Sequence, residues 1–280
     1  MQTLAEIREL LEARGLAPRH ALGQNFLIDK NLLARFVDTA AVAAGDLILE
    51  VGPGTGTLTE ALLGRGADVV AVELDAGLAD LLEERIPTLG LPGRFTLIRG
   101  DALDGHRALN PALVAALGAR SCKLVANLPY AAATPIIMAL LTQHPSCGIL
   151  AATIQREVAD RLVAKPSTKD YGTLGIVAQA AAEITLVAKL SPECFWPRPD
   201  VHSAMVLLKR RAEPLAPDLP GLARFCQALF SKRRKQLGAI LGHDFPFPPG
   251  FDTKLRPEAL DVATLAALHA LAPDPPSSPS

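Results

Sequence analysis

The stretch LILEVGPGTG at residues 47–56 constrains the fold of this chain more than any other part of its sequence. Its apolar run leads into Glu50 and Val51, glycines follow in the spacing G-x-G-x-G, and residues 57–63 continue with helical periodicity. This order predicts a strand, a tight glycine turn and a helix. Glycines suit such a turn because the backbone bends sharply and a ligand comes close, where a Cβ atom would clash.

A carboxylate follows the next predicted strand. Residues 69–72 read VVAV and lead into Glu73, at the place where a carboxylate hydrogen-bonds the diol of a ribose. Glu50 precedes the first glycine of the turn, and it would repel a pyrophosphate but not a cationic ligand without phosphates. These charges predict S-adenosylmethionine, which has a sulfonium, an amino-acid end and a ribose. A turn whose glycines serve only chain geometry is the alternative, and Glu73 argues against it.

Composition limits the classes of protein to which this chain can belong. Its 280 residues allow one large or two modest domains, and no apolar run is long enough to span a membrane. The N-terminal residues read as an amphipathic helix with acidic residues rather than as a signal peptide, and the cysteines show no C-x-x-C spacing. We therefore expect a cytoplasmic protein without disulfides or a metal site. The net charge of −1 means that any nucleic-acid role must rest on local clusters.

Strand and helix patterns alternate over residues 47–164, which predicts a parallel sheet with helices on both faces. Ligands of such sheets bind at the carboxyl ends of the strands. Several candidate site residues fall at predicted strand ends, namely Glu50, Glu73, Asp101 and Asn127. We expect a Rossmann-like catalytic domain over residues 1–212, with an N-terminal helix and loop. A small all-helical domain is expected over residues 213–272 and a disordered tail over residues 273–280.

The sequence NLPY at residues 127–130 follows another predicted strand and precedes a helix predicted to begin at Thr134. Asn127 and the Leu128 carbonyl can accept hydrogen bonds from an exocyclic amine, and Pro129 stiffens the turn. The stretch holds no titratable base, which favours methyl transfer by positioning and electrostatics. Tyr130 can stack on a flipped base. A proline turn with a half-buried tyrosine is the structural alternative.

A second aromatic stretch, FWPRPDVHS, occupies residues 195–203. Its prolines predict a stiff, extended loop that projects Phe195, whose ring could cover the other face of the same base. Trp196 could contribute in the same way or simply pack. The alternative, about equally favoured by this stretch alone, is a rigid interdomain loop that carries an aromatic plug.

Positive charge is concentrated in the C-terminal third of the chain. Residues 205–240 hold eight Lys or Arg and two Asp or Glu, a local charge of +6 in a chain whose total is −1. The sequence FSKRRK at residues 230–235 opens a predicted helix over residues 232–241. This bias indicates a phosphate-binding surface made by Lys232, Arg233, Arg234 and Lys235, which Arg19 could extend. An ordinary solvated face is the alternative.

Taken together, these motifs resemble the ribosomal RNA adenine dimethyltransferase family over roughly residues 15–270, most closely its small-subunit type. The resemblance is carried by GQNFL at 23–27, EVGPGTGTLT at 50–59, VELD at 72–75, GDAL at 100–103, NLPY at 127–130, FWPRPDVHSAMV at 195–206 and FSKRRKQL at 230–237. It implies S-adenosylmethionine as the donor and dimethylation at N6 of two adjacent adenines in the 3′-terminal hairpin loop of 16S rRNA. The implied cofactor residues are Asn25, Leu27, Gly52, Gly54, Glu73, Asp101 and Asn127, and those that position adenine are Asn127, Leu128, Pro129, Tyr130 and Phe195.

Two departures from the family pattern concern RNA contacts. Arg19 and His20 stand before GQNFL, where the family often has more cations, and Gly238 and Ala239 stand where it often has an asparagine. A large-subunit methyltransferase of the macrolide-resistance type shares every catalytic motif, but the long C-terminal extension and the GQNFL start favour the small-subunit type. An RNA-binding assembly factor without turnover is the alternative from another class. We expect a monomer whose partner is 16S rRNA in the small subunit or its precursor, with no membrane partner.

Overall fold

The computed structural model describes residues 2–105 and 108–272, and the chain divides into two compact units. The sheet unit comprises Met1–Ala159 and Ile184–Arg210, and the helical unit comprises Asp160–Glu183 and Arg211–Ser280. The sequence placed residues 160–183 in the catalytic domain, whereas the compact units group them with the C-terminal helices. The reason is local packing, since α8 (Thr173–Ala181) contacts α9 (Leu219–Phe230) and α11 (Val262–Leu271). The predicted disordered tail lies outside the described residues.

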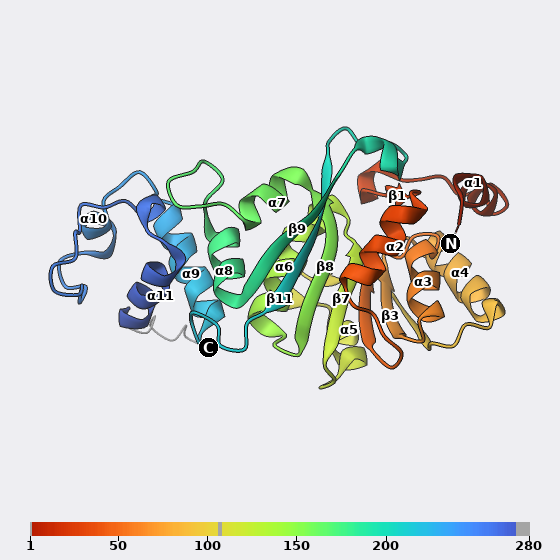
Figure 1. Ribbon diagram of the computed structural model, residues 1–280, viewed down its shortest axis with the longest axis horizontal. Helices are drawn as coiled ribbons and strands as arrows, with labels where there is room; N and C mark the ends of the chain where they lie inside the picture. The colour runs from red at the N-terminus through yellow and green to blue at the C-terminus, as the bar shows by residue number, and fades with distance from the viewer. Residues whose placement is uncertain (1, 106–107, 273–280) are drawn as a thin grey trace. The chain divides into compact units, whose positions relative to one another are not determined.

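A seven-stranded sheet with the order β4-β3-β2-β7-β8-β11-β9 forms the centre of the sheet unit (Figure 1). From β4 to β8 the neighbouring strands run parallel, and β11 runs antiparallel to β8. The predicted Rossmann-like α/β fold is confirmed, and the strands within residues 47–164 that form this sheet are parallel, as expected. Residues 191–202 join β9 to β11 without the helix that a parallel crossover needs, so β11 returns in the opposite direction. The strands are β2 (Leu47–Val51), β3 (Asp68–Glu73), β4 (Phe95–Arg99), β7 (Cys122–Asn127), β8 (Cys147–Gln155), β9 (Ala182–Leu190) and β11 (Ser203–Arg210).

Helices cover both faces of this sheet (Figure 1). Every residue of β2 is buried, including Glu50, which explains why its other residues are all apolar rather than alternating with polar ones. Alternate strand residues such as Ile48, Val69 and Val125 share one core with apolar side chains of α2, α3 and α4. The helices of this unit are α1 (Leu4–Glu12), α2 (Lys30–Thr39), α3 (Thr57–Gly64), α4 (Ala76–Arg85), α5 (Pro111–Leu117) and α6 (Tyr130–Gln143), and α7 (Arg156–Leu162) continues into the helical unit.

A two-stranded pairing joins two segments that are far apart in the sequence. Strand β1 (Phe26–Leu27) pairs antiparallel with β10 (Phe195–Trp196), and the rings of Phe26 and Trp196 stack with centroids 6.2 Å apart. The sequence predicted loops for both segments. The pairing matters for the site because it fixes the GQNFL segment against the aromatic segment that was expected to face the substrate. A second small pairing joins β5 (Leu103–Asp104) to β6 (Ala108–Leu109).

The helical unit is built from α8, α9, α11, the short α10 (Leu237–Leu241) and a 3₁₀ turn at Pro257–Ala259. Buried Tyr171 ties its segments together, because its hydroxyl donates to the Leu260 carbonyl at 2.8 Å and its ring meets that of Phe230 edge-on at 5.9 Å. Across residues 2–105 and 108–272, no helix combines the length and the hydropathy that a bilayer crossing requires.

Two predicted helices have different bounds in the structure. The helix predicted from Thr134 begins at Tyr130, because Pro129 has extended backbone that ends the turn and its carbonyl accepts from Ala133 at 3.1 Å. The helix predicted over residues 232–241 is wrong in its first half. Residues 232–235 form turns, and tertiary contacts hold them there: Arg233 donates to Glu258 at 2.8 Å and to the Thr168 carbonyl at 3.3 Å.

The glycine turn after β2 has the geometry that its sequence predicts. Gly52, Gly54 and Gly56 all have left-handed backbone, with φ of 69°, 62° and 87°. A Cβ atom added at Gly54 would lie 2.7 Å from Cε1 of Phe26, well inside contact distance. The turn therefore requires glycine for two reasons, since the backbone is left-handed and the ring of Phe26 occupies the space beside it.

We expect Gly54→Ala to lower the free energy of unfolding by about 1–3 kcal/mol, because it adds both backbone strain and a clash with Phe26. Gly64→Ala is the matched control, since Gly64 ends α3 and nothing lies within 4 Å of an added Cβ atom. This control should leave stability equal or raise it by up to about 1 kcal/mol. Urea unfolding followed by circular dichroism measures both, and equal midpoints for the two variants would contradict the assignment.

Candidate active site

A cleft of about 340 Å³ opens at the carboxyl ends of β2, β3 and β7 in the sheet unit. The strand order reverses between β2 and β7, which is where ligands bind in open α/β sheets. The structure brings most of the predicted cofactor residues into this one cleft, although they come from five separate segments of the chain. The cofactor residues that line it are Asn25, Gly52, Gly54, Glu73, Asp101 and Asn127.

Glu73 is the best fixed acidic group of the cleft. Its Oε2 accepts from the Gly54 N–H at 3.1 Å and its Oε1 accepts from the Asp75 N–H at 2.9 Å, so backbone donors set the orientation of the carboxylate. Burial raises the pKa of Glu73, and the two backbone hydrogen bonds oppose that rise. A carboxylate held in this way is preorganised to accept hydrogen bonds from a diol.

Asp75 links the second strand end to the N-terminal loop. Its Oδ1 caps α4 by accepting from the Gly77 N–H at 2.9 Å. Its Oδ2 accepts from Gln24 Nε2 at 3.1 Å and lies 3.3 Å from Nε of Arg19. Gln24 also accepts from the Arg19 N–H at 2.7 Å, so the three residues form one connected cluster. This cluster holds the loop that carries Asn25 beside the cleft.

Asp101 combines a place in the cleft with a capping role in a turn. It lines the cleft, and its Oδ1 accepts from the Leu103 N–H at 2.9 Å, which makes it the cap of the turn after β4. Its side chain is exposed rather than buried. The carboxylate is therefore oriented by the turn and remains open to a donor such as an aromatic amine.

Asn127 is clamped from two sides at the end of β7. Its Nδ2 donates to the Asn25 carbonyl at 2.7 Å, and its Oδ1 accepts a hydrogen bond from the Thr153 hydroxyl. Thr153 is buried and stands opposite Asn127 in the β7–β8 register. These partners fix which end of the amide is the acceptor, and one lone pair of Oδ1 remains for a further donor.

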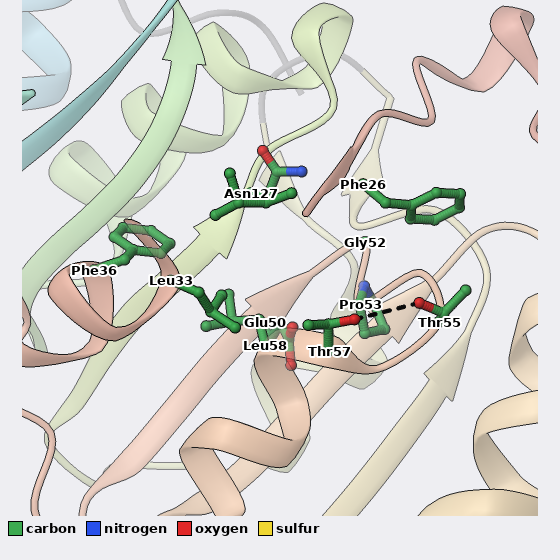
Figure 2. Close-up of a pocket in the computed structure, with 11 residues that line it drawn as sticks. Phe26, Leu33, Phe36, Glu50, Gly52, Pro53, Thr55, Thr57, Leu58 and Asn127 are labelled. Carbon is green, nitrogen blue, oxygen red and sulfur yellow. Dashed lines mark hydrogen bonds between the residues drawn. The ribbon is translucent and has the colours of Figure 1, made fainter. Parts of the chain in front are cut away.

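A smaller pocket of about 40 Å³ adjoins the cleft, with Phe26, Gly52 and Asn127 lining both. Figure 2 shows Asn127 on one side of it, opposite Glu50 and Leu58, with Leu33 and Phe36 of α2 closing one end. Leu27 lines this pocket and not the large cleft, and it is buried.

Glu50 is the unusual group of the small pocket. It is 1% exposed, and its Oε2 accepts from the Thr59 hydroxyl at 2.7 Å. Burial raises the pKa of Glu50 to about 8; the Thr59 hydrogen bond opposes this rise and the nearby Glu73 charge adds to it. Glu50 is therefore largely protonated at neutral pH in the protein without ligand, and a cation nearby would favour its ionised form.

Of the residues expected to position the target adenine, Asn127 and Pro129 line the large cleft, whereas Leu128, Tyr130 and Phe195 do not. Leu128 is 2% exposed, and Tyr130 is half-buried, with its hydroxyl sharing a hydrogen bond of 2.7 Å with the Ser203 hydroxyl. Phe195 is 3% exposed in the core, opposite Leu27 in the β1–β10 pairing. The loop does not project Phe195 as the prolines suggested, because the pairing with β1 draws it inward. Its stacking role stays a prediction.

The predicted RNA-binding residues differ in their surroundings. Arg19 pairs with Asp75 in the sheet unit, so it holds the N-terminal loop. In the helical unit, Arg233 forms an ion pair with Glu258 at 2.7 Å, whereas Lys232, Arg234 and Lys235 are exposed. Arg233 therefore has a structural role that the other three cations do not share.

Sequence reasoning did not identify three residues that organise the site. The sequence could have indicated Gln24 and Asp75, because they lie inside the GQNFL and VELD motifs near candidate site residues. No motif in the sequence indicated Thr153. Its contact with Asn127 depends on the register of β7 and β8, which the sequence does not reveal.

The sequence of this chain is similar to a known protein family and to proteins of nearly the same length. The family described as ribosomal RNA adenine dimethylase matches residues 16–266. A ribosomal RNA small subunit methyltransferase A from Opitutus terrae is 39% identical over 278 residues, covering 94% of this chain and 96% of that protein. The same-named protein from Geobacillus kaustophilus is 38% identical, with 97% of each chain covered.

Two solved structures share the fold. A dimethyladenosine transferase from Plasmodium falciparum superposes with a TM-score of 0.69 at 22% identity, covering 87% of this chain and 95% of that one. The 23S rRNA methyltransferase ErmE gives a TM-score of 0.65 at 25% identity, with coverage of 88% and 99%.

The raised pKa of Glu50 predicts how stability depends on pH. Between about pH 4.5 and pH 8 the folded protein keeps a proton on Glu50 that the unfolded chain releases, so the free energy of unfolding falls as pH rises through this window. Glu50→Gln removes this titration and can still accept from Thr59. We expect the variant to match wild type near pH 5 and to be more stable by a few kcal/mol at pH 8.5. Urea unfolding at both pH values tests this, and parallel pH profiles would contradict it.

Proposed function

Because this chain belongs to the ribosomal RNA adenine dimethylase family, we propose that it uses S-adenosylmethionine to dimethylate N6 of two adjacent adenines in the 3′-terminal hairpin loop of 16S rRNA. The observation that supports this best is the meeting of Glu73, Asp101 and Asn127 in one cleft at the strand-order reversal. The relatives that cover nearly the whole chain carry the small-subunit name, which favours that target over the large subunit.

The residues of the cleft fit S-adenosylmethionine. Glu73 is oriented to accept from the ribose hydroxyls, and Asp101 is open to accept from the adenine amine of the cofactor. Gly52 and Gly54 leave the turn without side chains beside the cleft, and Glu50 provides a negative charge for a cationic ligand once it ionises. When bound, this cofactor supplies an electrophilic methyl group on a sulfonium.

Asn127 and Leu128 suit the positioning of the target amine. The clamp by Thr153 and Asn25 leaves Oδ1 of Asn127 as a fixed acceptor, and hydrogen bonds to it would aim the nitrogen lone pair. Among the described residues that line the cleft, Glu73 and Asp101 are the ionisable ones, and both have assigned partners. Rate enhancement then comes from positioning and electrostatics rather than from a general base. Tyr130, Pro129 and Phe195 are proposed to shape the pocket of the flipped base.

The helical unit is proposed to hold the rRNA through its exposed cations. Lys232, Arg234 and Lys235 are solvent-exposed, and a phosphate backbone needs such charges. Arg19 and Arg233 would support binding indirectly, by holding the loops that carry their neighbours. The proposed partner is 16S rRNA in the small subunit or its precursor, and the proposed form is a monomer that acts in the cytoplasm, where ribosomes assemble.

We expect the wild-type protein to transfer tritiated methyl groups to small ribosomal subunits that lack these modifications and not to large subunits. Mass spectrometry of nuclease fragments should locate four methyl groups on two adjacent adenines of the 3′-terminal hairpin. Label confined to the large subunit would support the macrolide-resistance type instead. Binding to the small subunit without any label would support the assembly factor without turnover.

Two Tyr130 variants separate the contribution of the ring from that of the hydroxyl in this assay. Tyr130→Ala removes the ring and should lower kcat by roughly tenfold or more, as expected from the ~1–3 kcal/mol of a stacked base. Tyr130→Phe keeps the ring and loses only the hydrogen bond to Ser203, so its kcat should stay within about threefold of wild type. Both should bind S-adenosylhomocysteine with wild-type Kd, and a shared loss of cofactor binding would exclude the stacking role.

Replacing Lys232, Arg234 and Lys235 by alanine should weaken the salt dependence of rRNA binding. The slope of log Kd against the logarithm of the salt concentration should fall by roughly two to three. Arg233 is left in place because its ion pair with Glu258 holds the fold of the segment. The matched control replaces Lys189, an exposed cation of the sheet unit, and should leave the slope unchanged. Filter binding between 50 mM and 300 mM salt measures the slopes. Equal slopes for both variants would show that this segment does not contact the RNA phosphates.

A further inference from the structure

The loop that follows α10 in the helical unit (Figure 1) carries three phenylalanines. Their rings lie together. The centroids of Phe245 and Phe247 are 4.7 Å apart, and those of Phe247 and Phe251 are 5.4 Å apart with planes inclined by 14°. Phe245 is buried, whereas Phe247 and Phe251 are half-buried. We call these three residues the phenylalanine platform. Two of its rings are partly open to solvent, so a flat ligand could extend the stack.

Local hydrogen bonds and prolines hold the platform in place. The Phe247 N–H donates to the Phe245 carbonyl at 2.8 Å, and the Phe251 N–H donates to the Pro248 carbonyl at 3.0 Å. Gly250 has φ of +77° within the turn of residues 248–251, where a left-handed glycine closes a turn of type II. A rigid loop of this kind costs little additional entropy when it binds a partner.

Exposed cations lie on both sides of the platform in the sequence, and the fold brings their segments together. The Leu237 N–H donates to the Leu255 carbonyl at 2.8 Å, and the Gly238 N–H donates to the Thr253 carbonyl at 2.9 Å. A Cβ atom added at Gly238 would lie 3.2 Å from Thr253 Cβ, so glycine suits this close approach. Within residues 231–257, the exposed Lys and Arg side chains for which the described part of the chain provides no ion pair are Lys232, Arg234, Lys235, Lys254 and Arg256.

Negative charge is sparse in residues 231–257, the segment that contains the platform. Asp244 and Asp252 are the acids of residues 231–257, and Asp252 accepts from the Lys254 N–H at 2.9 Å within a turn. The balance among these residues is therefore positive. Aromatic faces flanked by cations are typical of surfaces that bind single-stranded nucleic acid, in which rings stack on bases while cations contact phosphates.

We propose that the phenylalanine platform stacks on an unpaired base of the rRNA substrate, with the flanking cations on the phosphates beside that base. This proposal rests on the proposed rRNA substrate and adds a second base contact, separate from the adenine that is methylated. Stacking depends little on base identity, so the platform would contribute affinity rather than sequence specificity. An RNA strand fits better than an apolar peptide because the exposed charges around the rings are mostly positive.

The test is a double variant, Phe247→Leu with Phe251→Leu, in the full-length chain. Leucine keeps apolar packing and removes the aromatic faces, so we expect binding of protein-free 16S rRNA to weaken by roughly 5- to 150-fold. The slope of affinity against salt should stay at the wild-type value, because no phosphate contact is lost. Phe247→Tyr with Phe251→Tyr should keep affinity near wild type, since both aromatic faces remain.

Phe225→Leu is the matched control, because Phe225 is also half-buried in the helical unit but packs against His269, with ring centroids 5.7 Å apart. Circular dichroism confirms that each variant is folded. The stacking proposal would be wrong if the double leucine variant bound with wild-type affinity, or if Phe225→Leu weakened binding equally. Neither result would affect the proposed methylation. Weakening seen only with assembled subunits would also overturn the stacking proposal, in favour of a protein contact. Failure of the wild-type chain to methylate small ribosomal subunits that lack these modifications would instead refute the proposed function.

Discussion

The hydrogen bond from the Gly54 N–H to the Glu73 carboxylate joins the turn after β2 to the end of β3, and the active site depends on it. It forms because β2 and β3 run parallel with Val51 opposite Val72, which brings their carboxyl ends together. It also needs left-handed backbone at Gly54, which directs the N–H toward Glu73 while Phe26 packs against the turn. One contact therefore couples the sheet register, the glycine turn and the N-terminal segment.

Burial of acidic groups beside this contact gives the cleft its preference for a cation. Glu50 and Glu73 both have raised pKa values, chiefly because burial disfavours their charged forms. A positively charged ligand would offset that cost and bind a site that is already shaped, since backbone donors and the Thr59 hydroxyl hold the carboxylates. In their ionised forms the same acids would repel phosphate, so these two carboxyl groups favour a sulfonium cofactor over a dinucleotide.

The two compact units present different kinds of side chain to their ligands. The sheet unit has fixed acceptors at its strand ends, which suits a small polar cofactor and a single base. The helical unit has exposed lysines and arginines beside partly open phenylalanine rings, which suits an extended polyanion. Arg19 and Arg233 form ion pairs with Asp75 and Glu258, so both arginines also help to hold the segments that carry them.

The sequence by itself determined the glycine turn, the alternation of strands and helices, and the acidic and amide residues at the strand ends. These follow from local rules, since backbone conformation, periodicity and burial leave direct traces in neighbouring residues. Only the tertiary structure decided that Thr153 orients Asn127, that Phe195 turns inward against Leu27, and that Arg233 stops the basic segment from being a helix. Each of these contacts joins residues brought together by strand register or loop packing, and their energies depend on partners that no local pattern specifies.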